Sequence, residues 1–182
     1  TLTIRYLKGG GVTSNVAAVD MPNCMSDTYM NYYIVCSNVT LDADGGYAVT
    51  GKVSNTAKTD NDMYYAGRSH DMGGAIFVVR VGNMGGAESA IVAQRNYNFQ
   101  TALTGNNSIL EGYLYNIRST SHNKYSIYNG INGTSNTNDR FWRYRMQSED
   151  DDTNVYDGLY ITPIGASNFT GGNFTLYGMR TS

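Results

Sequence analysis

Segments in which apolar and polar residues alternate recur along the chain, and they constrain the fold more than any other feature. The clearest segment runs from Asp139 to Gln147, where Phe141, Arg143 and Arg145 alternate with Trp142, Tyr144 and Met146. A period of two places successive side chains on opposite faces of a strand. Comparable segments rich in Tyr, Val, Ile and Phe lie at 29–39, 46–54, 75–81, 110–118, 124–128, 155–162 and 173–179.

Clusters of Gly, Asn and Asp separate these segments. They lie at 42–46, 73–74, 82–86, 105–107 and 171–172. The sequence has 21 Gly and 16 Tyr, and only 15% of its residues are charged, which suits strands and turns better than helices. Only 87–103 admits a helical interpretation, and its Asn and aromatic residues favour a strand there too. We therefore expect an all-β chain folded as a jelly-roll-like antiparallel β-sandwich.

The domain organisation is simple. A length of 182 residues favours one domain, and neither Pro22 nor Pro163 lies in a linker-like stretch. Three consecutive glycines at 9–11 predict a hinge, so residues 1–15 are expected to form a short N-terminal arm and residues 16–182 the sandwich. Alternating side chains in the arm would let it add a strand to a neighbouring subunit; these are Leu2, Ile4 and Tyr6.

Charge and hydropathy exclude two classes of partner. The formal net charge is −2 and no run of Lys or Arg exists, so nucleic acid is not expected as a partner. No stretch approaches 18 uninterrupted apolar residues, so a membrane is not expected either. Thr1 at the first position fits both removal of an initiator Met and an internal fragment boundary.

No arrangement of residues predicts catalysis or a metal or cofactor site. The segment 46–52 has the spacing of a phosphate-binding loop, but Val53 replaces the required Ser or Thr and the alternation predicts a strand. His70 is expected in a solvated turn, and the acidic run 149–152 in an exposed turn. Cys24 and Cys36 are interpreted as free buried thiols, with a single bridge as the alternative.

The remaining candidates for functional residues are carboxylates and aromatic side chains. Glu88 and Glu111 show no spacing that makes them a glycosidase pair. Aromatic side chains could stack on sugar rings or anchor a protein interface. The candidates are Tyr64, Tyr65, Tyr97, Phe99, Tyr113, Tyr115 and Trp142. Among these we select Tyr64, Tyr65 and Trp142, together with the three alternating residues of the arm, as interface residues.

The end of the chain carries a family resemblance. Residues 155–162 read VYDGLYIT, and residues 169–178 read FTGGNFTLYG. A strand followed by a Gly turn and a last strand ending in Leu-Tyr-Gly resembles the ending of virion proteins of tailed bacteriophages. Weaker similarity extends over most of residues 16–180. The resemblance implies a jelly-roll or lectin-like sandwich used in capsid decoration proteins and tail-fibre modules, and it implies no enzyme activity.

Two functional hypotheses follow from this resemblance. The first is a capsid decoration (cement) protein on the outer surface of the virion, a homotrimer that clamps subunits of the major capsid protein. The second is a tail-fibre or tailspike module that binds a receptor or host-surface carbohydrate. A third interpretation, a secreted glycan-cleaving enzyme, would need turnover that depends on Glu88 or Glu111, and none is expected.

Overall fold

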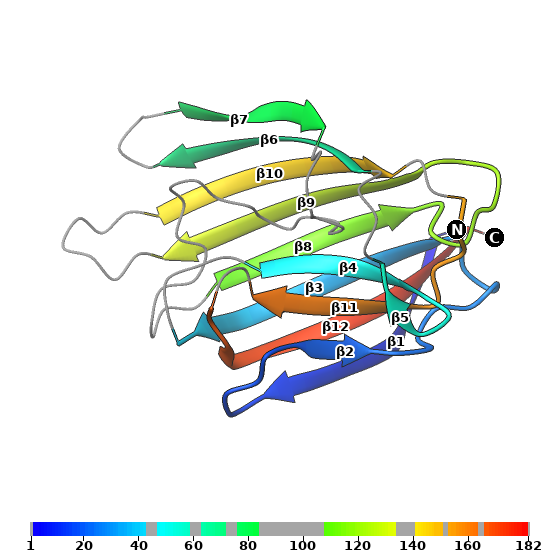
Figure 1. Cartoon of the computed structure of the whole chain (residues 1–182), viewed down its shortest axis with the longest axis horizontal. Helices are drawn as coiled ribbons and strands as arrows, with labels where there is room; N and C mark the ends of the chain where they lie inside the picture. The colour runs from blue at the N-terminus through cyan, green and yellow to red at the C-terminus, as the bar shows by residue number, and fades with distance from the viewer. Residues whose placement is uncertain are drawn as a thin grey trace.

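The computed structural model describes residues 2–42, 47–58, 63–71, 76–83, 108–133, 141–150, 153–163 and 166–181. These residues form β-strands and connecting loops, and none of them is helical (Figure 1). The strands are β1 (Leu2–Val12), β2 (Val19–Met21), β3 (Asn31–Leu41), β4 (Tyr47–Val53), β5 (Thr56–Ala57), β6 (Met63–Asp71), β7 (Ile76–Asn83), β8 (Ser108–Tyr115), β9 (Lys124–Gly133), β10 (Phe141–Asp150), β11 (Gly158–Pro163) and β12 (Phe169–Thr181).

The strands form two antiparallel sheets. The large sheet has eight strands in the order β1-β12-β3-β8-β9-β10-β6-β7, and the small sheet has four in the order β2-β11-β4-β5. Strands that follow one another in the chain lie in different sheets at β1 and β2, β2 and β3, β3 and β4, β5 and β6, β10 and β11, and β11 and β12. Figure 1 shows the small sheet in front of the large one, over the half that contains β3 and β12. The prediction of an all-β antiparallel β-sandwich is therefore confirmed.

The core lies between the sheets, and β3 shows how the sequence produces it. Along β3 buried and half-buried residues alternate, so that Tyr32, Ile34 and Cys36 point into the core. Their partners on the flanking strands, Leu176 and Leu110, point the same way and are also fully buried. The small sheet contributes apolar side chains from β4 and β11 to the same cluster. A period of two thus gives the large sheet one apolar face toward the core.

Large tyrosines in the core pack against glycines. Tyr128 lies over Gly112 of the neighbouring strand, where an added Cβ would be 2.2 Å from Cδ1 of the ring. Tyr156 lies over Gly51 in the same way, with the corresponding distance to its ring at 2.4 Å. A side chain at either glycine would overlap an aromatic ring that is fully buried.

We predict that Gly112→Ala lowers the free energy of unfolding by about 2 kcal/mol or more, because the Tyr128 ring must move in a close-packed core. The measurement is equilibrium unfolding in denaturant. Gly10→Ala is the matched control, since nothing lies within 4 Å of a Cβ added there. The control is expected to stay within about 0.5 kcal/mol of the parent. Equal unfolding midpoints for Gly112→Ala and the parent would contradict the packing described.

The prediction of an independently moving N-terminal arm is wrong. Residues 2–12 form β1, which pairs with β12 from Leu2↔Thr181 to Val12↔Gly172. The glycines at 9–11 lie inside this pairing, opposite Thr175, Phe174 and Asn173, and form no hinge. Backbone hydrogen bonds to β12 hold the segment in the sheet, so the boundary proposed at residue 15 separates no arm from the body. The two termini consequently lie side by side (Figure 1).

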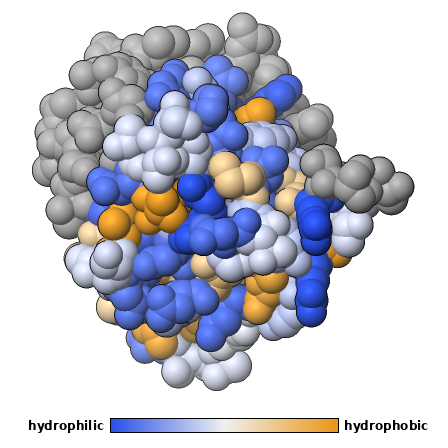
Figure 2. Space-filling model, turned by 90° about the vertical axis from the view of Figure 1, so that its right-hand side faces the viewer, coloured by the Kyte–Doolittle hydropathy of each residue, from blue (hydrophilic) through white to orange (hydrophobic). Residues whose placement is uncertain are grey.

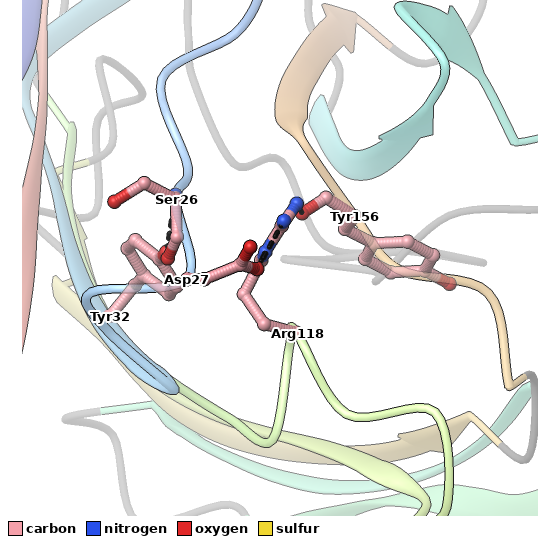
Figure 3. Close-up of polar contacts among 5 residues, drawn as sticks. All are labelled: Ser26, Asp27, Tyr32, Arg118 and Tyr156. Atoms are coloured by element: carbon pink, nitrogen blue, oxygen red, sulfur yellow. Dashed lines mark hydrogen bonds and ion pairs between the residues drawn. The ribbon is translucent and has the colours of Figure 1, made fainter.

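One end of the sandwich is closed by three loops that Arg118 joins. The Arg118 guanidinium donates from Nη1 to the carbonyl oxygen of Tyr156 at 3.0 Å and from Nε to Oδ1 of Asp27 at 2.9 Å (Figure 3). The hydroxyl of Tyr32 donates to the carbonyl oxygen of Ser26 and accepts from its amide, both at 2.9 Å. These contacts connect the loop before β3, the loop after β8 and the segment before β11.

The two cysteines are free, as the favoured interpretation predicted, with Cys36 buried and Cys24 partly buried. Burial raises the pKa of the Cys24 thiol from 9.0 to about 11, and it also raises the pKa of Cys36. Burial raises the pKa of the Tyr32 hydroxyl from 10.0 to about 12. In each case the folded protein holds a proton that the unfolded chain releases at lower pH.

We predict a loss of stability in alkali. The contribution of these groups is fully present below the unfolded pKa values of 9.0 for thiols and 10.0 for tyrosines. It is lost as the pH rises toward the folded values of about 11 and about 12. Denaturant unfolding measured between pH 7 and 11 checks this. The double variant Cys24→Ala/Cys36→Ala should flatten the pH dependence in the thiol range. A parent free energy of unfolding that stays constant up to pH 11 would contradict the prediction.

Candidate functional site

The outer face of the large sheet, which points away from the small sheet, carries a row of tyrosines. We call Tyr6 of β1, Tyr177 of β12, Tyr33 of β3 and Tyr113 of β8 the tyrosine row. The strand register places them directly opposite one another, as Tyr6↔Tyr177, Tyr177↔Tyr33 and Tyr33↔Tyr113. Four neighbouring strands therefore contribute one aromatic ring each at the same level of the sheet.

The rings of the tyrosine row are in contact along its length. The ring centroids are 6.1 Å apart for Tyr6 and Tyr177, 6.0 Å for Tyr177 and Tyr33, and 4.9 Å for Tyr33 and Tyr113. The two inner pairs are tilted by 35° and 39°, whereas Tyr6 stands edge-on at 75° to Tyr177. These separations fall within the range of favourable aromatic pairs. The row is therefore a continuous aromatic strip across four strands.

Two further tyrosines extend the strip toward β9. Tyr115 lies two residues beyond Tyr113 on the same face, with the rings 6.4 Å apart and nearly parallel at 14°. Tyr125 of β9 is paired with Tyr115 and is 42% exposed. At the opposite end, Tyr6 is 58% exposed and its ring lies over Gly9, where a Cβ would meet the ring at 3.2 Å.

Carboxylates hold two of the hydroxyl groups. The Tyr33 hydroxyl donates to Oε2 of Glu111 at 2.8 Å, and the Tyr125 hydroxyl donates to Oε1 of Glu149 at 3.1 Å. Desolvation by burial and the bond to Glu111 raise the pKa of Tyr33. The bond to Glu149 is the main cause of the raised pKa of Tyr125. Both rings thus stay neutral and are held in fixed positions.

A second, polar row runs parallel to the tyrosine row on the same face. Glu111, Asn129 of β9 and Arg145 of β10 are directly opposite one another in the register. Glu111 also bonds Tyr33, so the polar row and the tyrosine row are joined at one residue. The outer face therefore offers aromatic rings beside amide, carboxylate and guanidinium groups.

The structure describes the sequence-predicted interface residues to different extents. Ile4 and Tyr6 lie on the outer face and are exposed, at 51% and 58%. Leu2 is paired with Thr181 at the end of β1. The backbones of Tyr64 and Tyr65 lie in β6 and that of Trp142 in β10, but the side chains of Leu2, Tyr64, Tyr65 and Trp142 are outside the described ones. Glu88, Tyr97 and Phe99 lie outside the described residues altogether.

Sequence reasoning missed Tyr33 and Tyr177 as candidate residues. Both were present in segments predicted as strands, and their alternation with Tyr32 and Gly178 indicates that they point away from the core. Nothing in the sequence shows which strands are neighbours. The alignment of these tyrosines with Tyr6 and Tyr113 is therefore visible only in the register.

A buried ionic cluster lies elsewhere, on the core side of β9 and β10. Nζ of Lys58 donates to Oδ1 of Asp150 at 2.8 Å, and both side chains are nearly inaccessible at 3% and 2%. The Tyr156 hydroxyl donates to the other carboxylate oxygen of Asp150. The Tyr156 ring lies 5.8 Å from Nζ of Lys58 and 5.1 Å from Nζ of Lys124. The prediction that the acidic run is an exposed turn is therefore wrong for Asp150.

This cluster connects parts of the chain that are far apart in sequence. Lys58 follows β5, Asp150 ends β10, and Tyr156 precedes β11, so the ionic and aromatic contacts join both sheets. A buried carboxylate needs such partners, because its transfer from water is costly without them. The charged groups of the cluster therefore face one another inside the fold, where each is paired.

We predict that Asp150→Ala lowers the free energy of unfolding by about 3–5 kcal/mol, because it leaves the Lys58 ammonium buried without its carboxylate. The control is Asp27→Ala, which removes an ion pair whose carboxylate is 88% exposed. Its cost is expected below about 1 kcal/mol. Denaturant unfolding of both variants checks the prediction. Equal losses for the two would mean that the buried pair contributes no more than the surface pair.

The histidines show no shared site in the described part of the chain. His70 lies in β6, paired with Arg143 and Ile76, so its predicted position in a turn is wrong. His122 is exposed, and its Nδ1 lies 3.2 Å from Oγ of Ser119 and 3.0 Å from Oγ of Ser121. Among the described residues, no three His, Cys, Asp or Glu side chains group as metal ligands. The described part of the chain holds strands and loops and therefore no helix long and apolar enough to cross a membrane.

Comparisons with known proteins assign no family. No protein-family model matches the chain, and no curated protein matches it. One solved structure is weakly similar, that of the alginate lyase Aly36B in complex with alginate trisaccharide. The match has a TM-score of 0.28 and 9% identity, and it covers 99% of this chain and 88% of the lyase chain. A similarity at this level carries no argument about activity.

Proposed function

We propose that the chain is a non-enzymatic structural protein of a tailed-phage virion that decorates the capsid and acts through its surface. One observation supports this most. Five large hydrophobic side chains of the described part are exposed, and four of them, Ile4, Tyr6, Ile109 and Tyr125, lie on the outer face of the large sheet. Gathering of exposed aromatic and aliphatic side chains on one face is typical of an interaction surface.

Other parts of the surface look different. Figure 2 shows the end of the sandwich at the right of Figure 1, where hydrophilic residues predominate and the apolar patches among the coloured residues are small and separate. The buried ionic cluster joins parts of the fold and is not on the surface. The outer face is thus the part of the described surface best suited to contact a partner.

Strand β1 gives a structural route to such a contact. It is the edge strand of the large sheet, and its stretch Thr3–Tyr6 is exposed. A bulge at Leu7 and the cation of Lys8 limit the regular edge to this short stretch. A neighbouring copy or a strand of the major capsid protein can add to the sheet there, with Ile4 and Tyr6 as apolar contacts.

We predict that the protein occurs in hundreds of copies on the capsid shell of the phage that encodes it. Electron microscopy of virions labelled with an antibody against the protein locates it. Ile4→Asp and Tyr6→Asp should reduce its occupancy on the shell, because a buried contact loses apolar area and gains an unpaired charge. Met30→Asp is the matched control, since Met30 is 45% exposed but lies in the loop before β3. A few copies confined to the tail would overturn the decoration role.

The second candidate is a receptor- or carbohydrate-binding module of a tail fibre or tailspike. The tyrosine row favours it, because tyrosines combine apolar ring faces with polar ends. Tyr6 is exposed, and the other three tyrosines of the row are half-buried on the same outer face.

For the decoration role, light scattering complements the localisation, since a decoration protein that clamps capsid subunits as a trimer is expected to be trimeric in solution. A monomer at micromolar concentration would contradict the trimer and leave the localisation as the deciding result.

A further inference from the structure

We propose that the tyrosine row, with the polar row beside it, is a binding platform for an uncharged polysaccharide chain of pyranose rings. The inference deepens the second candidate function by naming its ligand class. It rests on the surface-binding role proposed above but not on the position of the protein in the virion. Polysaccharide binding can therefore be absent while the protein is found on the capsid shell. Binding can equally be found while the protein is absent from the shell.

The first step of the argument is shape. A pyranose ring has an apolar face of C–H groups and a rim of hydroxyl groups. Four tyrosines on four adjacent strands, at centroid separations of 4.9 to 6.1 Å, form a strip that successive rings of one chain can follow. Adjacent strands are about 4.8 Å apart, which is close to these separations, so each strand adds one ring and the strip has no gap. A single sugar would need one ring, whereas a strip this long fits a chain.

The second step is hydrogen bonding. A carbohydrate chain must exchange its bonds with water for bonds with the protein, since unpaired polar groups are costly. The polar row supplies an acceptor at Glu111, an amide at Asn129 and a donor at Arg145, all on the face that carries the rings. The Glu111 carboxylate accepts from Tyr33 through Oε2, and its two oxygens offer further acceptor positions. Such mixed apolar and polar surfaces suit sugars better than an aliphatic protein surface.

The third step is charge. Two carboxylates, Glu111 and Glu149, bond hydroxyl groups of the aromatic strip itself. The described cation nearest to them in the polar row, Arg145, is separated from Glu111 by the strand β9. A ligand lying on the rings therefore meets negative charge first, which disfavours uronic-acid and sulfated chains. The charge pattern selects an uncharged polysaccharide.

The fourth step is preorganisation. Tyr33 and Tyr125 are each held by a carboxylate, Tyr113 and Tyr115 are stacked, and Tyr6 rests on Gly9. Rings fixed before binding lose little rotational freedom when a ligand arrives. Tyrosine is moreover a residue that gives large contact area with only two side-chain torsions. The strip is thus formed in the absence of ligand.

Native affinity electrophoresis tests the proposal. The gels contain hydroxyethylcellulose, galactomannan or dextran as neutral probes, and alginate or polygalacturonate as anionic probes. The parent protein should be retarded by at least one neutral polysaccharide and by neither anionic one. Tyr33→Ala and Tyr113→Ala should each weaken this binding about tenfold, the effect of about 1.4 kcal/mol. Tyr33→Phe keeps the ring and should retain most of the affinity.

The matched control is Tyr160→Ala, which removes a partly exposed tyrosine of β11 in the small sheet. Its binding should equal that of the parent. Thermal unfolding of each variant separates loss of the platform from loss of the fold. No retardation by any neutral probe, binding to anionic probes only, or unchanged binding by both alanine variants of the row would overturn the proposal. Light scattering in which Tyr33→Ala and Tyr113→Ala dissociate an oligomer would assign the row to a second copy of the chain instead.

Discussion

The position of β3 between β12 and β8 is the constraint on which both faces of the large sheet depend. Its register places Ile34 beside Leu176 and Gly112 on the core face, and Tyr33 beside Tyr177 and Tyr113 on the outer face. A slip of one residue would exchange the two faces of β3. The apolar core and the tyrosine row are therefore two consequences of one pairing, and the burial of Ile34 secures the position of Tyr33.

The core also contains charged side chains, although a sandwich of this size can fill its core with apolar side chains alone. Lys58, Asp150 and Tyr156 come from three segments that meet only in the folded chain, and their contacts require each segment to be correctly placed. Buried ionic groups contribute little net stability when all partners are present, but a wrong arrangement would leave a charge unpaired. We infer that the cluster favours one packing of the sheets over alternatives with similar apolar area. The cluster therefore acts on the uniqueness of the fold, and it lies on the core side of the large sheet, opposite the face that carries the tyrosine row.

Local patterning in the sequence was enough to predict most strands and the sandwich, because alternation records which side of a strand meets the core. Local patterning gave wrong predictions where a residue distant in sequence determines the conformation or burial of a segment. The glycines of 9–11 indicate a hinge when considered alone, yet pairing with β12 holds them in a strand. Asp150 belongs to an acidic run that looks solvated, yet Lys58, far away in sequence, removes it from water. The tyrosine row depends on pairing of four strands that are not all consecutive, so the individual residues were visible in the sequence but their alignment was not.

Tyrosine on the outer face combines apolar contact area with solubility, two properties that conflict for a purely apolar side chain. A flat strip of Phe or Leu on a large sheet would offer contact area but would also promote association between copies. In the tyrosine row, hydroxyl groups remain at the rim of each ring, and those of Tyr33 and neighbouring Tyr125 are bonded to carboxylates. The chain has 16 Tyr but only 15% charged residues. Tyrosine hydroxyls therefore supply part of the polar groups that Lys and Glu supply on other surfaces. A surface of this kind is apolar in area and polar at its edges, and a ligand with the same division, apolar ring faces and hydroxylated rims, can satisfy both parts of it together.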